Sequence, residues 1–414
     1  MSGLLLAPFV GVHASAQGAT QPDSVVARSG EHSSSARRPG SWRFDPDAGA
    51  VYSKGDFKWI VWGFAERYWG PRSEQVGADA WRRVRQGMEF DLPRLNGVFR
   101  PAVVYEVDLT NNNFFRSGRS SQVFENLYLA IQNPDDATRF RALFGENTHI
   151  LSREDNLSSG NLPTINRSLI LEEHGSVNSF GTQWGAQVFK ALSSRTSIAF
   201  SAQDNRGSLN TSRPSYHVGN SIAVKVNRLL VRDTLARRQM TIGASADYTR
   251  AIYDRRFTLS SAVGGEAIGA TTATGNKFTV EGDAAYAWFI GSHPLSVEGE
   301  YLFSDFSRSL TDVSGGYVML QGSLFDAKRW GDLDPFARYD VVRLSREIAR
   351  GRAIQQAFRT GVNYNLPRSR KHVNLHIEYA FNHVEGPVGI VPMRRSFGEF
   401  RVEMRISAVR YLRH

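Results

Sequence analysis

Apolar and polar side chains alternate along most of this chain, in runs of about ten residues that each end in a polar turn. The last run is the clearest, because Phe400, Val402 and Met404 alternate with charged residues in strict period two. In a strand, this period places the apolar side chains on one face and the charges on the other. About sixteen such runs follow one another from Asp56 onward, with no stretch of helical period between them. The pattern therefore predicts an all-β protein.

The number of strands favours a barrel over a water-soluble sandwich. A sandwich usually has fewer strands, and closure into a ring leaves no free strand edge. Short connections such as 133–137 and 291–294 alternate with longer ones, and short turns are typical of the periplasmic side of a barrel. We predict a sixteen-stranded antiparallel transmembrane β-barrel over residues 51–414. Its strands are expected at residues 57–68, 81–92, 98–109, 123–132, 138–145, 180–189, 196–203, 221–230, 240–249, 277–289, 295–304, 317–325, 334–342, 356–366, 372–382 and 399–411.

The N-terminal region has a different composition. Leu4–Val12 is a short apolar run, and the small residues at 14–16 form the pattern of a signal-peptidase site. No basic residue precedes the apolar run, so a buried strand is the alternative interpretation of it. We expect residues 1–16 to be a signal peptide and residues 17–50 to be a flexible periplasmic leader. Signal-directed export would bring the protein to the bacterial outer membrane.

Composition argues against several other classes of protein. With 41% hydrophobic residues, the chain has no run of about twenty apolar residues that could form a membrane-spanning helix. It has no cysteine, so disulfides, thiolate metal sites and cysteine nucleophiles are excluded. No Gly-x-Ser-x-Gly elbow, zincin spacing or phosphate-binding glycine loop occurs. We expect no catalytic residue, metal, cofactor or nucleic-acid partner. A barrel hydrolase that uses Ser and His is the competing class.

The charge balance indicates what such a barrel would conduct. Lys plus Arg number 50 against 40 Asp plus Glu, a net charge of +10, and 43 of the 50 are Arg. Arginine binds carboxylate or phosphate oxygens in a fork, so an arginine-rich lumen favours multidentate anions. A charge that faces lipid near the midplane costs about 2–4 kcal/mol, so basic residues in the strands are expected to face inward. These are Arg67, Arg83, Arg85, Arg139, Arg141, Lys225, Lys277, Arg338, Arg359 and Arg405.

Two observations qualify the interpretation of these arginines. Carboxylates such as Glu66 and Glu403 lie in the same strands, so any single arginine could instead serve only to pair across strands. One connection, Glu146–Ser179, exceeds thirty residues without alternation, and a loop of this length is usually functional or disordered. It carries two further candidates for the anion pathway, Arg153 and Arg167.

Several stretches resemble the phosphate-selective porins O and P. Phe144–Glu146 followed by Ile165–Leu169 is similar to the segment that leads into the constriction loop of that family. The other similar stretches are Trp81–Arg85, Gly316–Leu324, Thr360–Leu366 and Val373–Tyr379. The resemblance implies a sixteen-stranded, usually trimeric outer-membrane barrel whose third long loop folds into the lumen and whose basic side chains conduct anions. On this basis Arg153 and Arg167 would join the arginines of the second and fifth strands at the narrowest point.

The chain departs from that family at three places. Residues 145–149 lack the lysine that the family commonly has there, and Asn166 stands where a glutamate is common. The resemblance therefore implies a general anion preference rather than phosphate selectivity. The chain also ends on Arg413 and His414, whereas barrels of this class usually end on an aromatic residue.

We predict an outer-membrane porin, a passive diffusion channel that prefers anions, with phosphate or polyphosphate as candidate permeants. Its expected partners are small anions, outer-membrane lipid and lipopolysaccharide, and two further copies in a homotrimer. The alternative function is surface interaction or scaffolding by a barrel with a nonselective or plugged lumen.

Overall fold

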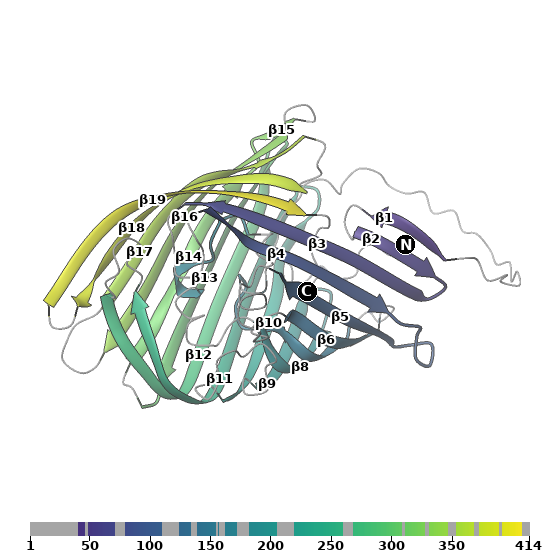
Figure 1. Ribbon diagram of the computed structural model, residues 1–414, viewed down its shortest axis with the longest axis horizontal. Coiled ribbons are helices and arrows are strands. Elements are labelled where there is room, and N and C mark those ends of the chain that lie inside the picture. The colour runs from purple at the N-terminus through teal and green to yellow at the C-terminus, as the bar shows by residue number, and fades with distance from the viewer. Residues whose placement is uncertain are drawn as a thin grey trace, which may run out of the picture.

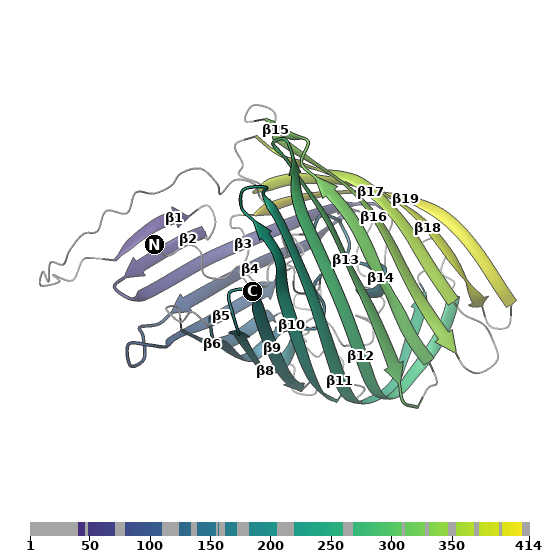
Figure 2. The same cartoon turned by 180° about the vertical axis from the view of Figure 1, so that it is seen from behind.

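The computed structural model describes residues 40–45, 49–70, 79–109, 124–133, 139–154, 156, 162–171, 182–204, 219–259, 268–308, 311–327, 331–346, 353–367, 372–388 and 391–407. Antiparallel strands form a closed ring, seen from two sides in Figures 1 and 2. The signal peptide expected at residues 1–16 lies outside the described residues, as does most of the expected leader, and both stay predictions.

The ring has sixteen strands, and each predicted strand overlaps one of them. They are β3 (Phe57–Trp69), β4 (Asp79–Asp91), β5 (Arg100–Asp108), β6 (Phe124–Gln132), β7 (Arg141–Thr148), β8 (Thr182–Ala191), β9 (Thr196–Asp204), β10 (Asn220–Asp233), β11 (Arg238–Leu259), β12 (Ile268–Ile290), β13 (His293–Phe306), β14 (Thr311–Gly322), β16 (Gly331–Arg346), β17 (Ala353–Asn365), β18 (Val373–Val388) and β19 (Val391–Ser407). The last strand returns to the first, from Val402 opposite Trp69 to Ser407 opposite Phe64. The predicted sixteen-stranded antiparallel barrel is confirmed.

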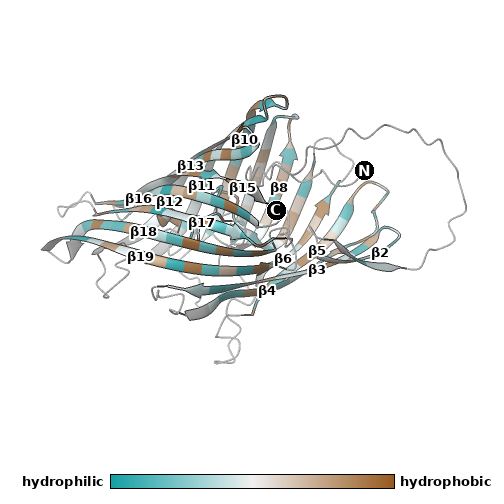
Figure 3. Ribbon diagram, turned by 90° about the horizontal axis from the view of Figure 1, so that it is seen from above, coloured by the Kyte–Doolittle hydropathy of each residue, from teal (hydrophilic) through white to brown (hydrophobic). Residues whose placement is uncertain are grey.

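The two faces of the ring have opposite character. On β10, Ile222 is 53% exposed whereas its neighbours Ala223 and Lys225 are buried, and alternation of this kind recurs around the ring. Figure 3 shows it as alternating bands of hydropathy along strands such as β18 and β19. Large apolar side chains cover the outer face and charged ones the inner face. An exposed apolar surface of this extent is typical of contact with lipid.

Aromatic residues mark one edge of the apolar outer face. Tyr248 on β11, Phe303 on β13 and Phe381 on β18 are exposed, and a polar residue follows two positions later on the same face of each strand. These polar residues lie on the side of the long connections. Such a girdle is expected where a barrel passes from hydrocarbon to headgroups.

A hairpin precedes the ring and completes its seam. It consists of β1 (Ser41–Asp45) and β2 (Gly49–Lys54), and β2 pairs with the first residues of β3 on the edge that β19 uses further along. Trp42 of β1 contacts Tyr52 and Trp59. β1 lies within residues 17–50, which we expected to be a flexible leader. A five-residue strand shows little alternation in the sequence, and β1 depends on these contacts with the ring. A further short strand, β15 (Phe325–Ala327), extends the turn before β16.

Beside this seam, apolar side chains pack on the inner face. The buried members of the cluster are Val51, Ile60, Trp62, Ala102, Val104, Tyr128, Ala130 and Leu143. The ring of Trp62 lies against Gly87 of β4, where a Cβ atom would be 2.3 Å from Cε2 of the indole. The absence of a side chain at position 87 is what allows Trp62 to lie against the wall.

We expect Gly87→Ala to lower the free energy of unfolding by about 1–3 kcal/mol, because its methyl group would displace the indole. The same substitution should cost much less in a Trp62→Ala background, which removes the clash. Urea unfolding in detergent, followed by far-UV circular dichroism, measures both costs. Gly282→Ala is the matched control, since a Cβ atom there has no neighbour within 4 Å. Equal costs in the two backgrounds would contradict the prediction.

Candidate functional site

The connection between β7 and β8 lies inside the ring. Its described residues are 149–154, 156 and 162–171, which we call the inner loop. The inner loop contacts side chains of β4, of β10 to β13 and of β16 to β19. All of these side chains belong to the polar face of a closed ring. A segment that touches strands on several sides of this face can only do so from within.

Wall side chains bind the backbone of the inner loop at consecutive positions. All six carbonyl oxygens from Leu162 to Arg167 accept a hydrogen bond from the wall. The donors are Arg405 to Leu162 (2.6 Å) and Thr164 (3.0 Å), Asn363 to Pro163 (2.8 Å), Arg82 to Ile165, and Arg359 to Asn166 (3.2 Å) and Arg167 (3.0 Å). Buried carbonyl groups need such partners, and here charged side chains take the place that a neighbouring strand would fill.

The loop amides are bound in the same way by carboxylates. Glu378 accepts from the amide of Ile165 at 3.0 Å, and Asp340 accepts from that of Leu169 at 3.3 Å. Glu154, which belongs to the loop itself, accepts from the amide of Ser168 at 2.8 Å. The backbone between Leu162 and Leu169 is therefore held on both its donor and acceptor sides.

Arg338 of β16 is the centre of this attachment. Its guanidinium is fully buried, 2.6 Å from Oε1 of Glu154 and 3.0 Å from Oδ1 of Asp340, and it lies 4.0 Å above the ring of Tyr317. Burial alone would raise the pKa of Glu154, but Arg338 and the Ser168 amide outweigh it and hold that pKa below its ordinary value. The Glu154 carboxylate is thus ionised, and both charges are compensated within the contact.

A second set of charges holds the start of the inner loop. Arg153 lies 3.4 Å from Asp283 and 3.3 Å from Glu298; burial would lower the pKa of Arg153, but these carboxylates raise it above its ordinary value. Lys225 donates to the carbonyl of Leu151 at 2.9 Å. His149 faces Asp247 at 3.4 Å, and the same carboxylate lies 3.1 Å from Lys277.

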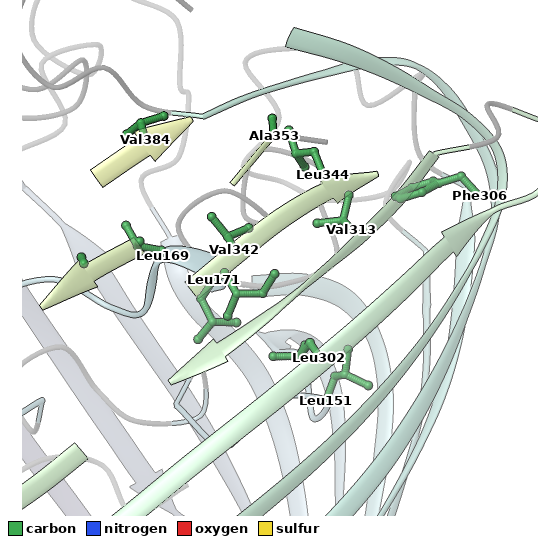
Figure 4. Packing of buried hydrophobic residues seen from close by; sticks show 12 residues of the cluster. Leu151, Leu169, Leu171, Leu302, Phe306, Val313, Val342, Leu344, Ala353 and Val384 are labelled. Atoms are coloured by element: carbon green, nitrogen blue, oxygen red, sulfur yellow. The ribbon is translucent and has the colours of Figure 1, made fainter. Parts of the chain in front are cut away.

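Apolar contacts add to the attachment. Figure 4 shows Leu151, Leu169 and Leu171 of the inner loop among residues of the wall. The wall residues of this cluster are Leu302, Phe306, Val313, Val342, Leu344, Ala353, Ala357 and Val384. Each buried leucine contributes about 1.5–3 kcal/mol relative to an exposed one, so the cluster opposes release of the loop.

The inner loop also meets a row of arginines on β4. The pairing of β3 with β4 passes from Glu66–Arg83 to Arg67–Trp81 and leaves Arg82 as the extra residue of a bulge. A bulge lets two adjacent side chains point to one face. Arg82 and Arg83 therefore both point inward, where they lie 3.1 Å from Glu403 and 3.0 Å from Glu66.

These residues form one group, the arginine cluster, which consists of Arg82, Arg83 and Arg85 of β4 and Arg167 of the inner loop. Arg85 lies 3.1 Å from Glu106, and Arg167 is close enough to Arg83 for the two charges to repel each other. The β4 side chains keep 11–17% of their surface exposed, unlike the buried arginines of β16 and β17. The cluster is where basic groups of the wall and of the loop meet.

Six of the other expected pathway residues lie on the inner side of the ring. Arg141 faces inward and donates to the hydroxyl of Tyr128 at 3.3 Å, and Arg153 is paired as described. Lys225, Lys277, Arg338 and Arg359 lie on the inner face but are buried in contacts with carboxylates or with the inner loop.

Two expectations about orientation are wrong. Arg67 lies on the outer face, stacked 5.9 Å from the ring centre of Trp69 and 5.5 Å from that of Trp81, because Glu66 already occupies the inward position. Arg139 lies in the turn before β7, with a φ of 50°, because the strand begins only at Arg141.

The alternation of the sequence did not indicate Arg82 as an inward residue. Strict alternation assigns Arg82 to the outer face, and only the bulge turns it inward. The available signal was the pair of adjacent charges at 82 and 83, since one of the two would otherwise face lipid.

The described residues contain no group of three or more His, Asp or Glu side chains arranged to hold a metal ion. Over the same residues, no helix has both the length and the apolar character needed to cross a membrane.

We expect Arg338→Met to lower the free energy of unfolding by about 3–5 kcal/mol, because it leaves the Glu154 and Asp340 carboxylates buried beside an apolar side chain. The double variant Arg338→Met with Glu154→Gln should recover part of the loss. Urea unfolding in detergent measures both. Arg343→Gln on the same strand, where the side chain is exposed, is the control and should change stability by less than about 0.5 kcal/mol. No recovery in the double variant would contradict the pairing.

The lowered pKa of Glu154 predicts how acid affects the inner loop. A group whose folded pKa lies below its ordinary value, here 4.5, stabilises the fold fully above that value and loses its contribution as pH falls through the folded pKa. The stability difference between the natural protein and Glu154→Gln should therefore be constant from about pH 7 to pH 5 and shrink below pH 4.5. Urea unfolding at a series of pH values measures this difference, and a constant difference down to about pH 2 would contradict the role of Glu154.

Comparison with known proteins supports the fold. No family model and no curated protein matches the sequence, so the expected membership of the phosphate-selective porins O and P is not confirmed.

The solved structures that are similar in fold include three outer-membrane proteins. OmpT, an outer membrane protein of Vibrio cholerae, has 11% identity, a TM-score of 0.55 and coverage of 86% of this chain and 98% of its own. The anion-selective porin from Comamonas acidovorans has 12% identity, a TM-score of 0.54 and coverage of 85% and 99%. The outer membrane channel DcaP of Acinetobacter baumannii has 13% identity, a TM-score of 0.50 and coverage of 86% and 98%. Identities this low show the shared barrel fold and nothing finer.

Proposed function

We propose that this protein is an outer-membrane porin, a passive diffusion channel that prefers anions. The observation that carries the proposal is the arginine cluster, in which Arg82, Arg83 and Arg85 of the wall meet Arg167 of the inner loop. The fold shared with an anion-selective porin and with other outer-membrane channels supports it.

The chemistry of the cluster suits anions with several oxygens. Each β4 arginine has a carboxylate partner that holds the side chain in place, and each guanidinium has five N–H groups in a rigid fork. The repulsion between Arg167 and Arg83 would be relieved by an anion between them. Fixed positive charge also raises the local concentration of anions, and neighbouring weak sites let an ion pass without being trapped. Phosphate and polyphosphate are therefore candidate permeants.

The pathway that we propose is narrower than the set expected from the sequence. It comprises Arg83, Arg85, Arg141 and Arg167, with Arg82 added. Arg153, Arg338, Arg359, Lys225 and Lys277 serve in this proposal to hold the inner loop.

The proposal extends to location and partners. The apolar outer face and its aromatic girdle suit an outer membrane, with lipid and lipopolysaccharide as neighbours, after export directed by residues 1–16. We propose a homotrimer, which is consistent with a trimer form of the Vibrio cholerae protein. Passive conduction rather than catalysis is the proposed activity.

Single-channel recording in a planar bilayer under a salt gradient tests this function. We expect a reversal potential that shows anion preference, and we expect Arg83→Gln with Arg85→Gln to reduce the anion-to-cation permeability ratio about tenfold at low salt. This follows from about 0.35 kcal/mol per charge at about 12 Å in water-like surroundings, which acts with opposite sign on anion and cation and so changes their ratio about threefold per charge. Arg343→Gln, which removes one positive charge from the outer face, is the control. Cation preference would overturn the proposal, and absence of conductance would favour the scaffolding alternative.

A further inference from the structure

We infer that Arg359 is a positioning residue for the anion pathway, which it influences only through Arg167. The guanidinium of Arg359 is 1% exposed and cannot contact a permeant. It instead fixes the backbone at Arg167 through two carbonyl oxygens. The inference rests on the proposed function and adds to it a residue that acts without touching the ion.

The contacts around Arg167 carry the inference. Nη1 of Arg359 donates to the carbonyl oxygens of Asn166, at 3.2 Å, and of Arg167, at 3.0 Å. On the following side of Arg167, the Ser168 amide donates to Glu154 at 2.8 Å, and the Leu169 amide donates to Asp340 at 3.3 Å. The peptide groups before and after Arg167 are thus both fixed.

Asp340 links Arg359 to the rest of the attachment. Its Oδ2 atom lies 3.3 Å from Nε of Arg359, and its Oδ1 atom lies 3.0 Å from Nε of Arg338. The side chains of Arg338, Asp340 and Arg359 are at most 1% exposed. The ion pair with this carboxylate holds the Arg359 guanidinium beside the two loop carbonyls.

Repulsion explains why a positioning residue is needed. Arg167 and Arg83 carry like charges, and the charge of Arg167 opposes that of Arg83. If the loop backbone were released, the repulsion would move Arg167 away from the wall. Because Arg359 binds backbone carbonyls, it opposes this movement without neutralising either charge.

Lysine cannot replace arginine in this role. The planar guanidinium donates from several nitrogens in fixed directions, whereas an ammonium is a single point charge on a flexible stem. Arg359→Lys keeps the charge of the lumen but loses the simultaneous contact with Asp340 and two carbonyls. This variant therefore tests the position of Arg167 without changing the charge of the lumen.

The test measures the anion-to-cation permeability ratio from reversal potentials for the natural protein and for Arg359→Lys, Arg359→Met and Arg167→Met. We expect Arg167→Met to lower the ratio about threefold at low salt, as for one charge near the permeant. Both Arg359 variants should lower it about as far. In the Arg167→Met background, Arg359→Lys should have no further effect on the ratio, because the charge through which Arg359 acts is absent.

The control variant is Arg343→Gln, on the outer face of β16, which should leave the permeability ratio unchanged. If Arg359→Met does not fold, Arg359→Lys and Asp340→Asn, which frees the Arg359 guanidinium, decide the question in the same assay. An unchanged ratio in Arg359→Lys, or an additive loss with Arg167→Met, overturns the inference while leaving the proposed function in place. A natural channel without anion preference overturns the proposed function itself, and the inference with it.

Discussion

The hydrogen bonds between charged wall side chains and the backbone of the inner loop are the interaction on which the interior of this barrel depends. A ring of sixteen strands encloses more space than wall side chains fill, so its interior needs a further segment to shape it. That segment has no neighbouring strand with which to pair. Arginines and carboxylates of β16 to β19 provide its partners at nearly every peptide group from Leu162 to Leu169.

This arrangement explains why so much charge can be buried. An ion pair moved out of water loses hydration that its own attraction repays only with good geometry and further hydrogen bonds. Around Arg338 these conditions are met, because Glu154, Asp340 and the ring of Tyr317 surround it. Replacing such a set by apolar residues could be as stable, but it would leave the amides of Ser168 and Leu169 without acceptors. The charges are retained, in this view, because they fix one position of the loop.

The sequence predicted the barrel and the faces of most strands, because period-two alternation is local and strong. It also predicted that Arg83 and Arg85 face inward. It could not predict the bulge that turns Arg82 inward, nor that Arg67 would stack on two tryptophans outside, since both depend on the register of β3 against β4. Nor could it separate Arg359 from Arg85, because the contacts that bury Arg359 are with residues almost two hundred positions away.

A net charge of +10 is therefore a poor measure of what an ion in the lumen would encounter. Arg359 and Arg405 are charged but covered, whereas the arginines of β4 keep exposed surface. The loop is attached mainly through its backbone, which every residue has, whereas the wall contributes specific side chains. Substitutions in the loop can thus change the charge presented to the lumen, as at Arg167, without disturbing the attachment. Substitutions at Arg338, Arg359 or Arg405 would disturb the attachment itself. The division lets the loop alter selectivity while the wall preserves its position.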